Sequence, residues 1–81
     1  MVQVHFWGAL KPLVSGASSL EIEAGTIREL FQKLGDAHPG MKPHIERGIA
    51  VSINGRIFRD SWDQPLPGNA EIYLLPRIAG G

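Results

Sequence analysis

The sequence ends in Gly80-Gly81, where the group that could do chemistry is the α-carboxyl group of Gly81. Because glycine has no Cβ, its backbone can thread a narrow channel and its carbonyl carbon is open to attack from either side. The free carboxylate is an anion at neutral pH and is therefore a poor electrophile. A partner must activate it, most simply by using ATP to form an acyl-adenylate. The carboxyl group of Gly81 is thus the candidate reacting group.

A short segment, Arg77-Ile78-Ala79-Gly80-Gly81, follows Pro76, the residue at which we expect the last strand to end. When fully extended, such a segment spans at most about 16–18 Å, which is enough to enter a pocket on a partner protein. A Gly-Gly end alone more often means only a frayed or truncated terminus. Its position directly after the apolar run Leu74-Leu75 favours a function. We expect residues 1–76 to form the folded domain and residues 77–81 an extended tail.

The remaining polar residues predict neither a catalytic site nor a metal site. His5, His38 and His44 lack the spacing of metal ligands, and we expect them at surface or loop positions. The chain has no cysteine, which excludes a disulfide, a thiolate nucleophile and a cysteine-based zinc site. The acidic and hydroxyl residues form no recognisable triad with a histidine. We therefore expect a protein that is not an enzyme by itself and binds no metal or cofactor.

Length and charge narrow the class of protein further. A chain of 81 residues makes one small domain. Eight basic residues balance eight acidic ones, and no basic run stands out, which argues against nucleic acid as the main partner. The segment Met1–Trp7 lacks the charged start and long apolar stretch of a signal peptide, and no stretch approaches the length of a membrane span. We expect a cytoplasmic protein with no membrane partner.

Alternating apolar residues predict the strands that must position the tail. The segments Val2–Trp7 and Leu20–Ala24 alternate with period two and are expected to form an opening β-hairpin. Two further strands, Ile49–Ile53 and Arg56–Phe58, flank Asn54-Gly55, the strongest short hairpin signal. The last strand is expected over Ala70–Leu75.

One main helix is predicted between these strands. Thr26 offers an N-cap hydroxyl, and Glu29 stands where the capping box requires it. The apolar residues of the next two turns fall on one helical face; they are Ile27, Leu30, Phe31 and Leu34. We expect this helix to end near Gly35 and a short helical turn within Met41–Gly48. These elements predict an α+β domain with the helix packed on one face of a mixed sheet.

With these elements and this ending, the chain resembles the ubiquitin-like sulfur carriers, most closely the small subunit of molybdopterin synthase. The resemblance covers essentially the whole chain, and the ending together with the total length is its specific part. The matching segments are Val2–Trp7, the helix after Thr26, Val51-Ser52-Ile53-Asn54-Gly55, Pro65-Leu66-Pro67-Gly68-Asn69-Ala70-Glu71-Ile72 and Leu75-Pro76-Arg77-Ile78-Ala79-Gly80-Gly81.

The resemblance implies a β-grasp fold, in which the first and last strands lie side by side at the centre of the sheet. It also implies that a ubiquitin-activating-type adenylyltransferase uses ATP to adenylate Gly81, and that sulfur from a persulfide then replaces AMP to leave a thiocarboxylate. A thiocarboxylate is a soft, strong nucleophile that stays ionised near neutral pH. In the molybdopterin system the tail enters the active site of the large subunit, and other carriers deliver sulfur to other accepting enzymes.

A partner-binding face is expected on the side of the sheet that the helix leaves uncovered. If Val4 and Ile72 face the helix, alternation directs Trp7, Tyr73 and Leu75 to the other side. Related carriers have an apolar residue at the place of Ile57. Exposed apolar and aromatic residues are typical of partner surfaces, although the segment Met41–Gly48 or a loop could cover them instead. The tail residues Pro76, Arg77, Ile78 and Ala79 complete the expected partner-binding set.

The sequence leaves alternatives for the pathway that receives the sulfur and for the class of protein. Related carriers serve thiamine, cysteine, thiolated tRNA and secondary-metabolite pathways, and Arg77 stands where family members often carry a second proline. A ubiquitin-like protein modifier would join Gly81 to lysines. A structural domain of the phage tail-assembly type resembles the stretch Pro-Arg-Ile-Ala-Gly but normally continues beyond it.

Overall fold

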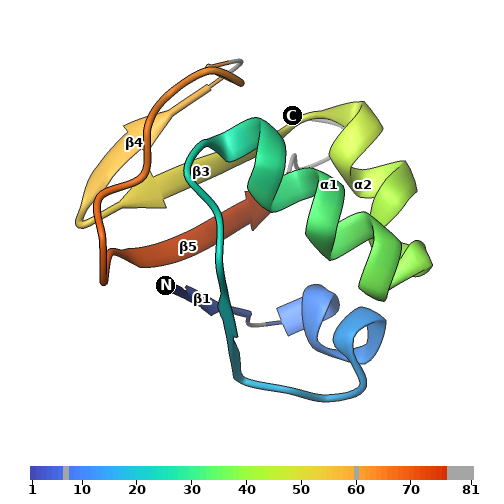
Figure 1. Cartoon of the computed structure of the whole chain (residues 1–81). Helices are drawn as coiled ribbons and strands as arrows, with labels where there is room; N and C mark the ends of the chain where they lie inside the picture. Colours follow the sequence, from blue (N-terminus) through green and yellow to red (C-terminus); the bar gives the residue numbers. More distant parts are fainter. Residues whose placement is uncertain (7, 60, 77–81) are drawn as a thin grey trace.

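Five strands form one mixed sheet in the part of the chain that this computed structural model describes, residues 1–6, 8–59 and 61–76 (Figure 1). The strands are β1 (Val2–His5), β2 (Ser19–Ile22), β3 (Ile49–Ile53), β4 (Arg56–Phe58) and β5 (Glu71–Pro76). Their order across the sheet is β2-β1-β5-β3-β4. The first and last strands pair in parallel, and the other neighbours are antiparallel. This arrangement confirms the predicted β-grasp fold.

The connection between β1 and β2 is longer than a simple hairpin turn. The two strands pair antiparallel as predicted, but the chain between them also forms a 3-10 helix, η1 (Gly8–Val14). Leu10 and Val14 are fully buried and attach this helix to the core. Ser15 and Gly16 then turn the chain back with φ angles of 59° and 79°. Because η1 is short and contains a proline, the alternation and helix patterns gave no sign of it.

The main helix, α1 (Ile27–Ala37), begins where the sequence predicts. The Thr26 side chain accepts a hydrogen bond of 3.2 Å from the Glu29 N–H, and Glu29 Oε1 accepts one of 2.6 Å from the Gly25 N–H. The helix ends at Ala37, two residues beyond Gly35 and before Pro39, close to its predicted end.

Gly35 is a packing position inside α1. The chain continues through a second 3-10 helix, η2 (Pro39–Met41), into a short helix, α2 (Lys42–Arg47), which contacts α1. A Cβ atom on Gly35 would lie only 3.2 Å from Lys42 Cγ. The absence of a side chain therefore lets α2 approach α1 closely.

Both α1 and α2 lie on the same side of the sheet, and the core fills the space between them and the strands (Figure 1). Val4, Ile72 and Leu74 on the central strands are fully buried, as is Leu30 on α1. The predicted helical turn within Met41–Gly48 thus becomes η2 and α2, which cover the same face as α1. The helices α1 and α2 leave the other face of the sheet uncovered (Figure 1), and Ile57 and Tyr73 are exposed there.

Candidate functional site

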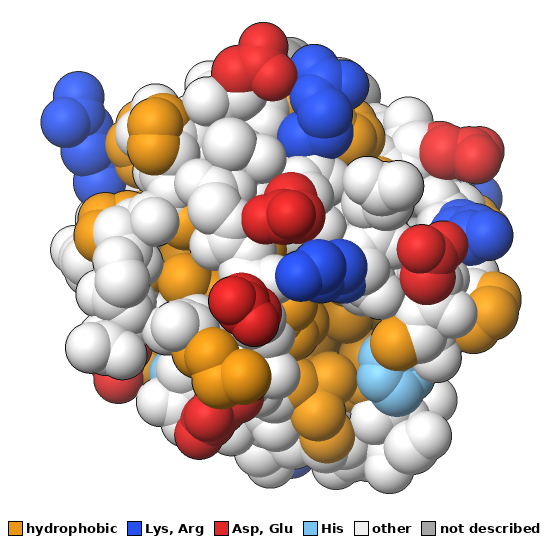
Figure 2. Space-filling view, viewed as in Figure 1, with side chains coloured by type: hydrophobic (Ala, Val, Ile, Leu, Met, Phe, Trp, Pro, Cys, Tyr) orange, Lys and Arg blue, Asp and Glu red, His pale blue; other side chains and the backbone are white. Residues whose placement is uncertain are grey.

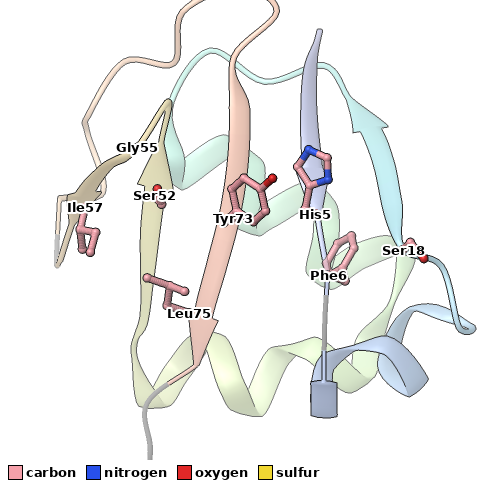
Figure 3. A pocket seen from close by; sticks show the side chains of 8 residues that line it. All are labelled: His5, Phe6, Ser18, Ser52, Gly55, Ile57, Tyr73 and Leu75. Atoms are coloured by element: carbon pink, nitrogen blue, oxygen red, sulfur yellow. The ribbon is translucent and has the colours of Figure 1, made fainter.

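Four residues line up across the uncovered face of the sheet (Figure 3). His5 on β1 is the cross-strand partner of Tyr73 on β5, which also pairs with Ser52 on β3; Ser52 in turn pairs with Ile57 on β4. Residues directly opposite each other in paired strands project to the same side of a sheet. We call these four residues, His5, Tyr73, Ser52 and Ile57, the cross-sheet row.

The cross-sheet row lies in a shallow hollow of about 590 Å³. Ile57 is 55% exposed and Tyr73 is 41% exposed, and Leu75 is half-buried beside them. The hollow is lined by His5, Phe6, Ser18, Ser52, Gly55, Ile57, Tyr73 and Leu75. The predicted placement of Ile57, Tyr73 and Leu75 on the uncovered face agrees with this geometry, and their role in partner binding stays a prediction. Neither α2 nor η2 covers them.

His5 and Ser52 were not among the predicted site residues. The His5 ring stacks on Tyr73 with 4.5 Å between the ring centres and 15° between the planes, which places it at the middle of the hollow and half-buried. Its Nε2 atom is buried without a hydrogen-bond partner among the described residues; Glu71 Oε1 is 4.0 Å away. The signal was present in the sequence, because His5 alternates with Val4 and Phe6.

The strand that precedes the predicted tail is held on both sides. Tyr73 pairs with His5 on β1, and Leu75 and Pro76 pair with Ala50 and Ile49 on β3. The last described residue, Pro76, is therefore anchored at the border of the uncovered face. The other predicted site residues lie outside the described residues; they are Trp7, Arg77, Ile78, Ala79, Gly80 and Gly81, together with the side chain of Pro76. The predicted boundary at residue 76 stays a prediction.

The described residues offer few other reactive groups. Within residues 1–6, 8–59 and 61–76, no three His, Asp or Glu side chains come together as a metal site would require. In the same ranges no helix has the length and apolar character needed to cross a membrane.

A β-grasp sheet with helices on one face and an apolar hollow on the other defines a domain of the ubiquitin-like class. The family model of the ThiS family matches residues 4–81. The chain therefore belongs to the ThiS family of ubiquitin-like sulfur carriers. Among curated proteins no sequence matches the chain.

Three solved structures illustrate the range of similar proteins. The BexX/CysO complex of Amycolatopsis orientalis contains a chain that is 24% identical, with 100% of both chains covered and a TM-score of 0.81. The small archaeal modifier protein 1 of Methanosarcina acetivorans is 23% identical over 99% of this chain and 95% of its own, with a TM-score of 0.81. These two likenesses show the fold alone.

The third structure is the complex of subunits 1 and 2 of molybdopterin-converting factor from Helicobacter pylori. Its matching chain is 28% identical over 99% of this chain and 97% of its own, with a TM-score of 0.68. Two of the three structures are complexes of the matching chain with a second protein.

Proposed function

We propose that this protein carries sulfur as a thiocarboxylate on the carboxyl group of Gly81 and donates it to an accepting enzyme. The observation that carries the proposal is the apolar hollow beside the end of β5, because the strand that leads into the tail is also the strand that presents Tyr73 and Leu75. A partner that docks on this face meets the tail at the same time. Membership of the ThiS family supports the same activity.

The chemistry requires two activities from partners. An adenylyltransferase lets a Gly81 carboxylate oxygen attack the α-phosphorus of ATP, which releases pyrophosphate and leaves an acyl-adenylate. The outer sulfur of a persulfide then attacks the acyl carbon and AMP leaves. A thiol cleaves the resulting S–S bond, so that the thiocarboxylate is released and a disulfide forms on the donor. This chain supplies the acyl group and the docking face.

The destination that we propose is the large subunit of molybdopterin synthase, with this chain as the small subunit in molybdenum cofactor biosynthesis. The support is the 28% identity to a chain of the molybdopterin-converting factor complex, over 99% of this chain. Delivery in another pathway and lysine modification are the alternatives that the experiment must separate.

The test is intact-mass analysis of the natural protein after incubation with a ThiS-type adenylyltransferase, ATP and a persulfide donor. The expected product has one oxygen replaced by sulfur at Gly81. The product is then mixed with a molybdopterin synthase large subunit and its pterin precursor, and sulfur transfer is measured.

The controls distinguish the alternatives. A variant that lacks Gly81 should form no thiocarboxylate, and lysine-linked adducts in place of the thiocarboxylate would indicate a protein modifier. A thiocarboxylate that the large subunit does not consume would overturn the molybdopterin assignment but not the carrier function. The absence of either product with every adenylyltransferase tried would contradict the proposal as a whole.

A further inference from the structure

The outer edge of β2 is a second candidate binding surface, because some of its backbone N–H and C=O groups have no partner among the described residues. β2 stands at one end of the sheet, outside β1 (Figure 3). The Phe6 N–H donates to the Ser18 carbonyl, and the antiparallel register continues from this pair along the strand. Hydrogen-bonded and non-hydrogen-bonded pairs alternate in such a ladder, so the backbone groups of Ser19 and Glu21 point away from β1. No described backbone group hydrogen-bonds to them.

A groove runs beside this edge, between β2 and α1. It has a volume of about 310 Å³, and its lining residues are Leu20, Glu21, Ile22, Glu23, Lys33, Leu34, Ala37 and His38. Leu20 and Ile22 pack against the core but are only half-buried, because no further strand covers them. Figure 2 shows apolar side chains that reach the surface in a hollow on the side that carries α1, beside a histidine and among charged side chains.

The backbone carbonyl of Glu23, just beyond β2, already has an internal partner. The Lys33 ammonium group donates a hydrogen bond to the backbone carbonyl of Glu23. The carboxylates of Glu21 and Glu23 have no salt-bridge partner among the described residues. The free edge is therefore limited to the residues of β2 itself and is acidic.

The opposite edge of the sheet is much less suited to pairing. β4 has only three residues, and the Arg56 guanidinium lies 5.5 Å from the centre of the Phe58 ring. Short strands and charged side chains protect an edge against added strands. Among the described residues, β2 offers an added strand both outward-pointing backbone groups and an adjoining groove with apolar lining.

We propose that the β2 edge binds an extended segment of a partner protein as an additional strand, and that this segment alternates apolar and basic residues. Main-chain hydrogen bonds to Ser19 and Glu21 would supply the pairing, as in other cases of strand addition. Residues opposite Leu20 and Ile22 face the groove and must be apolar. The residue opposite Glu21 lies on the other face of the sheet, where a Lys or Arg side chain forms a cross-strand ion pair.

A second copy of this chain fits the edge poorly. Pairing β2 with the β2 strand of another molecule would bring the carboxylates of two Glu21 and two Glu23 residues to one edge. Like charges across paired strands destabilise them, and charged edge residues keep proteins from associating in this way. The charge of the edge thus selects a basic partner segment.

The test is an NMR titration of the isotope-labelled full chain with a capped peptide of sequence Val-Lys-Val-Lys-Val. The expected result is a set of shift changes confined to residues 19–23 and 33–38, with slower exchange of the Glu21 amide hydrogen. The charge-reversed peptide Val-Glu-Val-Glu-Val should bind several-fold more weakly. A peptide whose backbone amides are N-methylated loses its main-chain donors and should also bind more weakly.

Matched variants of the protein separate the edge from general electrostatics. Glu21→Lys should reverse the preference between the two charged peptides. Glu46→Lys makes the same change of charge on the exposed surface of α2 and should leave the preference as it was. Neither substitution touches Gly81, so the result is independent of the proposed sulfur transfer.

Three outcomes would overturn the inference. The first is a set of shift changes centred on Tyr73 and Ile57 instead of β2. The second is equal binding of both charged peptides by the wild-type protein. The third is concentration-dependent dimerisation through β2 without peptide, which would make a second copy the occupant.

Discussion

Neighbouring residues on β5 contribute to the core and to the proposed docking face. Tyr73 is 41% exposed in the hollow, whereas Leu74 is fully buried in the core. The side chains of adjacent strand residues point to opposite faces of the sheet. Substitution of the two residues should therefore have different consequences.

We expect Tyr73→Ala to weaken binding to the adenylyltransferase by about 2 kcal/mol or more, because exposed aromatic side chains in a docking hollow are typical hot spots. The free energy of unfolding should change little. Calorimetric titration with the partner and urea unfolding measure the two quantities. Gln32→Ala, on the exposed side of α1, is the matched control and should leave binding unchanged.

Leu74→Ala should show the opposite pattern, with a loss of about 2–5 kcal/mol in unfolding free energy, because truncation of a buried leucine leaves a cavity.

For the Tyr73 prediction, equal loss of binding in Tyr73→Ala and Gln32→Ala would contradict the proposed docking face.

At the scale of the elements, the turn between β3 and β4 is tied to the central strand. Asn54 and Gly55 have φ angles of 49° and 91°, in the left-handed region that this tight hairpin turn requires. Asn54 also bonds to Glu71 twice: its N–H donates to the Glu71 carbonyl at 3.0 Å, and its Oδ1 accepts from the Glu71 N–H at 2.9 Å. The turn therefore aligns the start of β5 with the end of β3.

Two substitutions at Asn54 separate these roles. Asn54→Gly keeps the left-handed backbone and loses the side-chain hydrogen bond, which should cost about 1 kcal/mol of unfolding free energy. Asn54→Ala adds backbone strain and should cost about 1–2 kcal/mol more. Urea unfolding of both variants measures the difference. Equal unfolding free energies of the two variants would mean that an alanine in this left-handed conformation costs no strain energy.

The contact between α1 and α2 depends on Gly35. Gly35→Ala should be nearly neutral, because the gain in helix propensity of about 1 kcal/mol offsets the displacement of Lys42. Gly35→Leu should destabilise the protein by about 1–3 kcal/mol, since a larger side chain overfills the contact. Thermal and urea unfolding test both changes. A stabilised Gly35→Leu variant would show that α2 moves away without cost.

At the scale of the whole molecule, folding and the proposed chemistry are separated along the chain. Among the residues whose burial the structure describes, the fully buried ones lie between Val2 and Leu74, and we expect the tail to add nothing to this core. The partner is expected to hold the tail, and the sheet only has to present it.

Removal of residues 77–81 should therefore leave the unfolding free energy within about 0.5 kcal/mol of the wild-type value. The same variant should form no thiocarboxylate and should still bind partners through the uncovered face. Urea unfolding, intact-mass analysis and calorimetric titration measure these three properties. Strong destabilisation would show that the tail belongs to the fold, against the boundary predicted at residue 76.

The sequence alone was sufficient for the strands, the start of α1 and the directions of Tyr73 and Leu75, whereas the placement of Ile57 came from the family resemblance. These features depend on neighbours within a few residues, such as the alternation in Leu74-Leu75 or the hydrogen bond that the Thr26 side chain accepts from the Glu29 N–H, and local patterns contain them. It also determined the candidate reacting group, because the chemistry of a terminal carboxyl group does not depend on the fold.

Only the tertiary structure decided which residues meet. The cross-sheet row joins His5, Ser52, Ile57 and Tyr73 through the registers of three strand pairs. The groove at β2 forms because the fold brings Leu20 and Ile22 beside Leu34 and Ala37 of α1. Register and packing are set by contacts between segments far apart in the chain, which no local pattern specifies. The reacting group at Gly81 was therefore predicted from the sequence, whereas the surface proposed to present it had to be found in the fold.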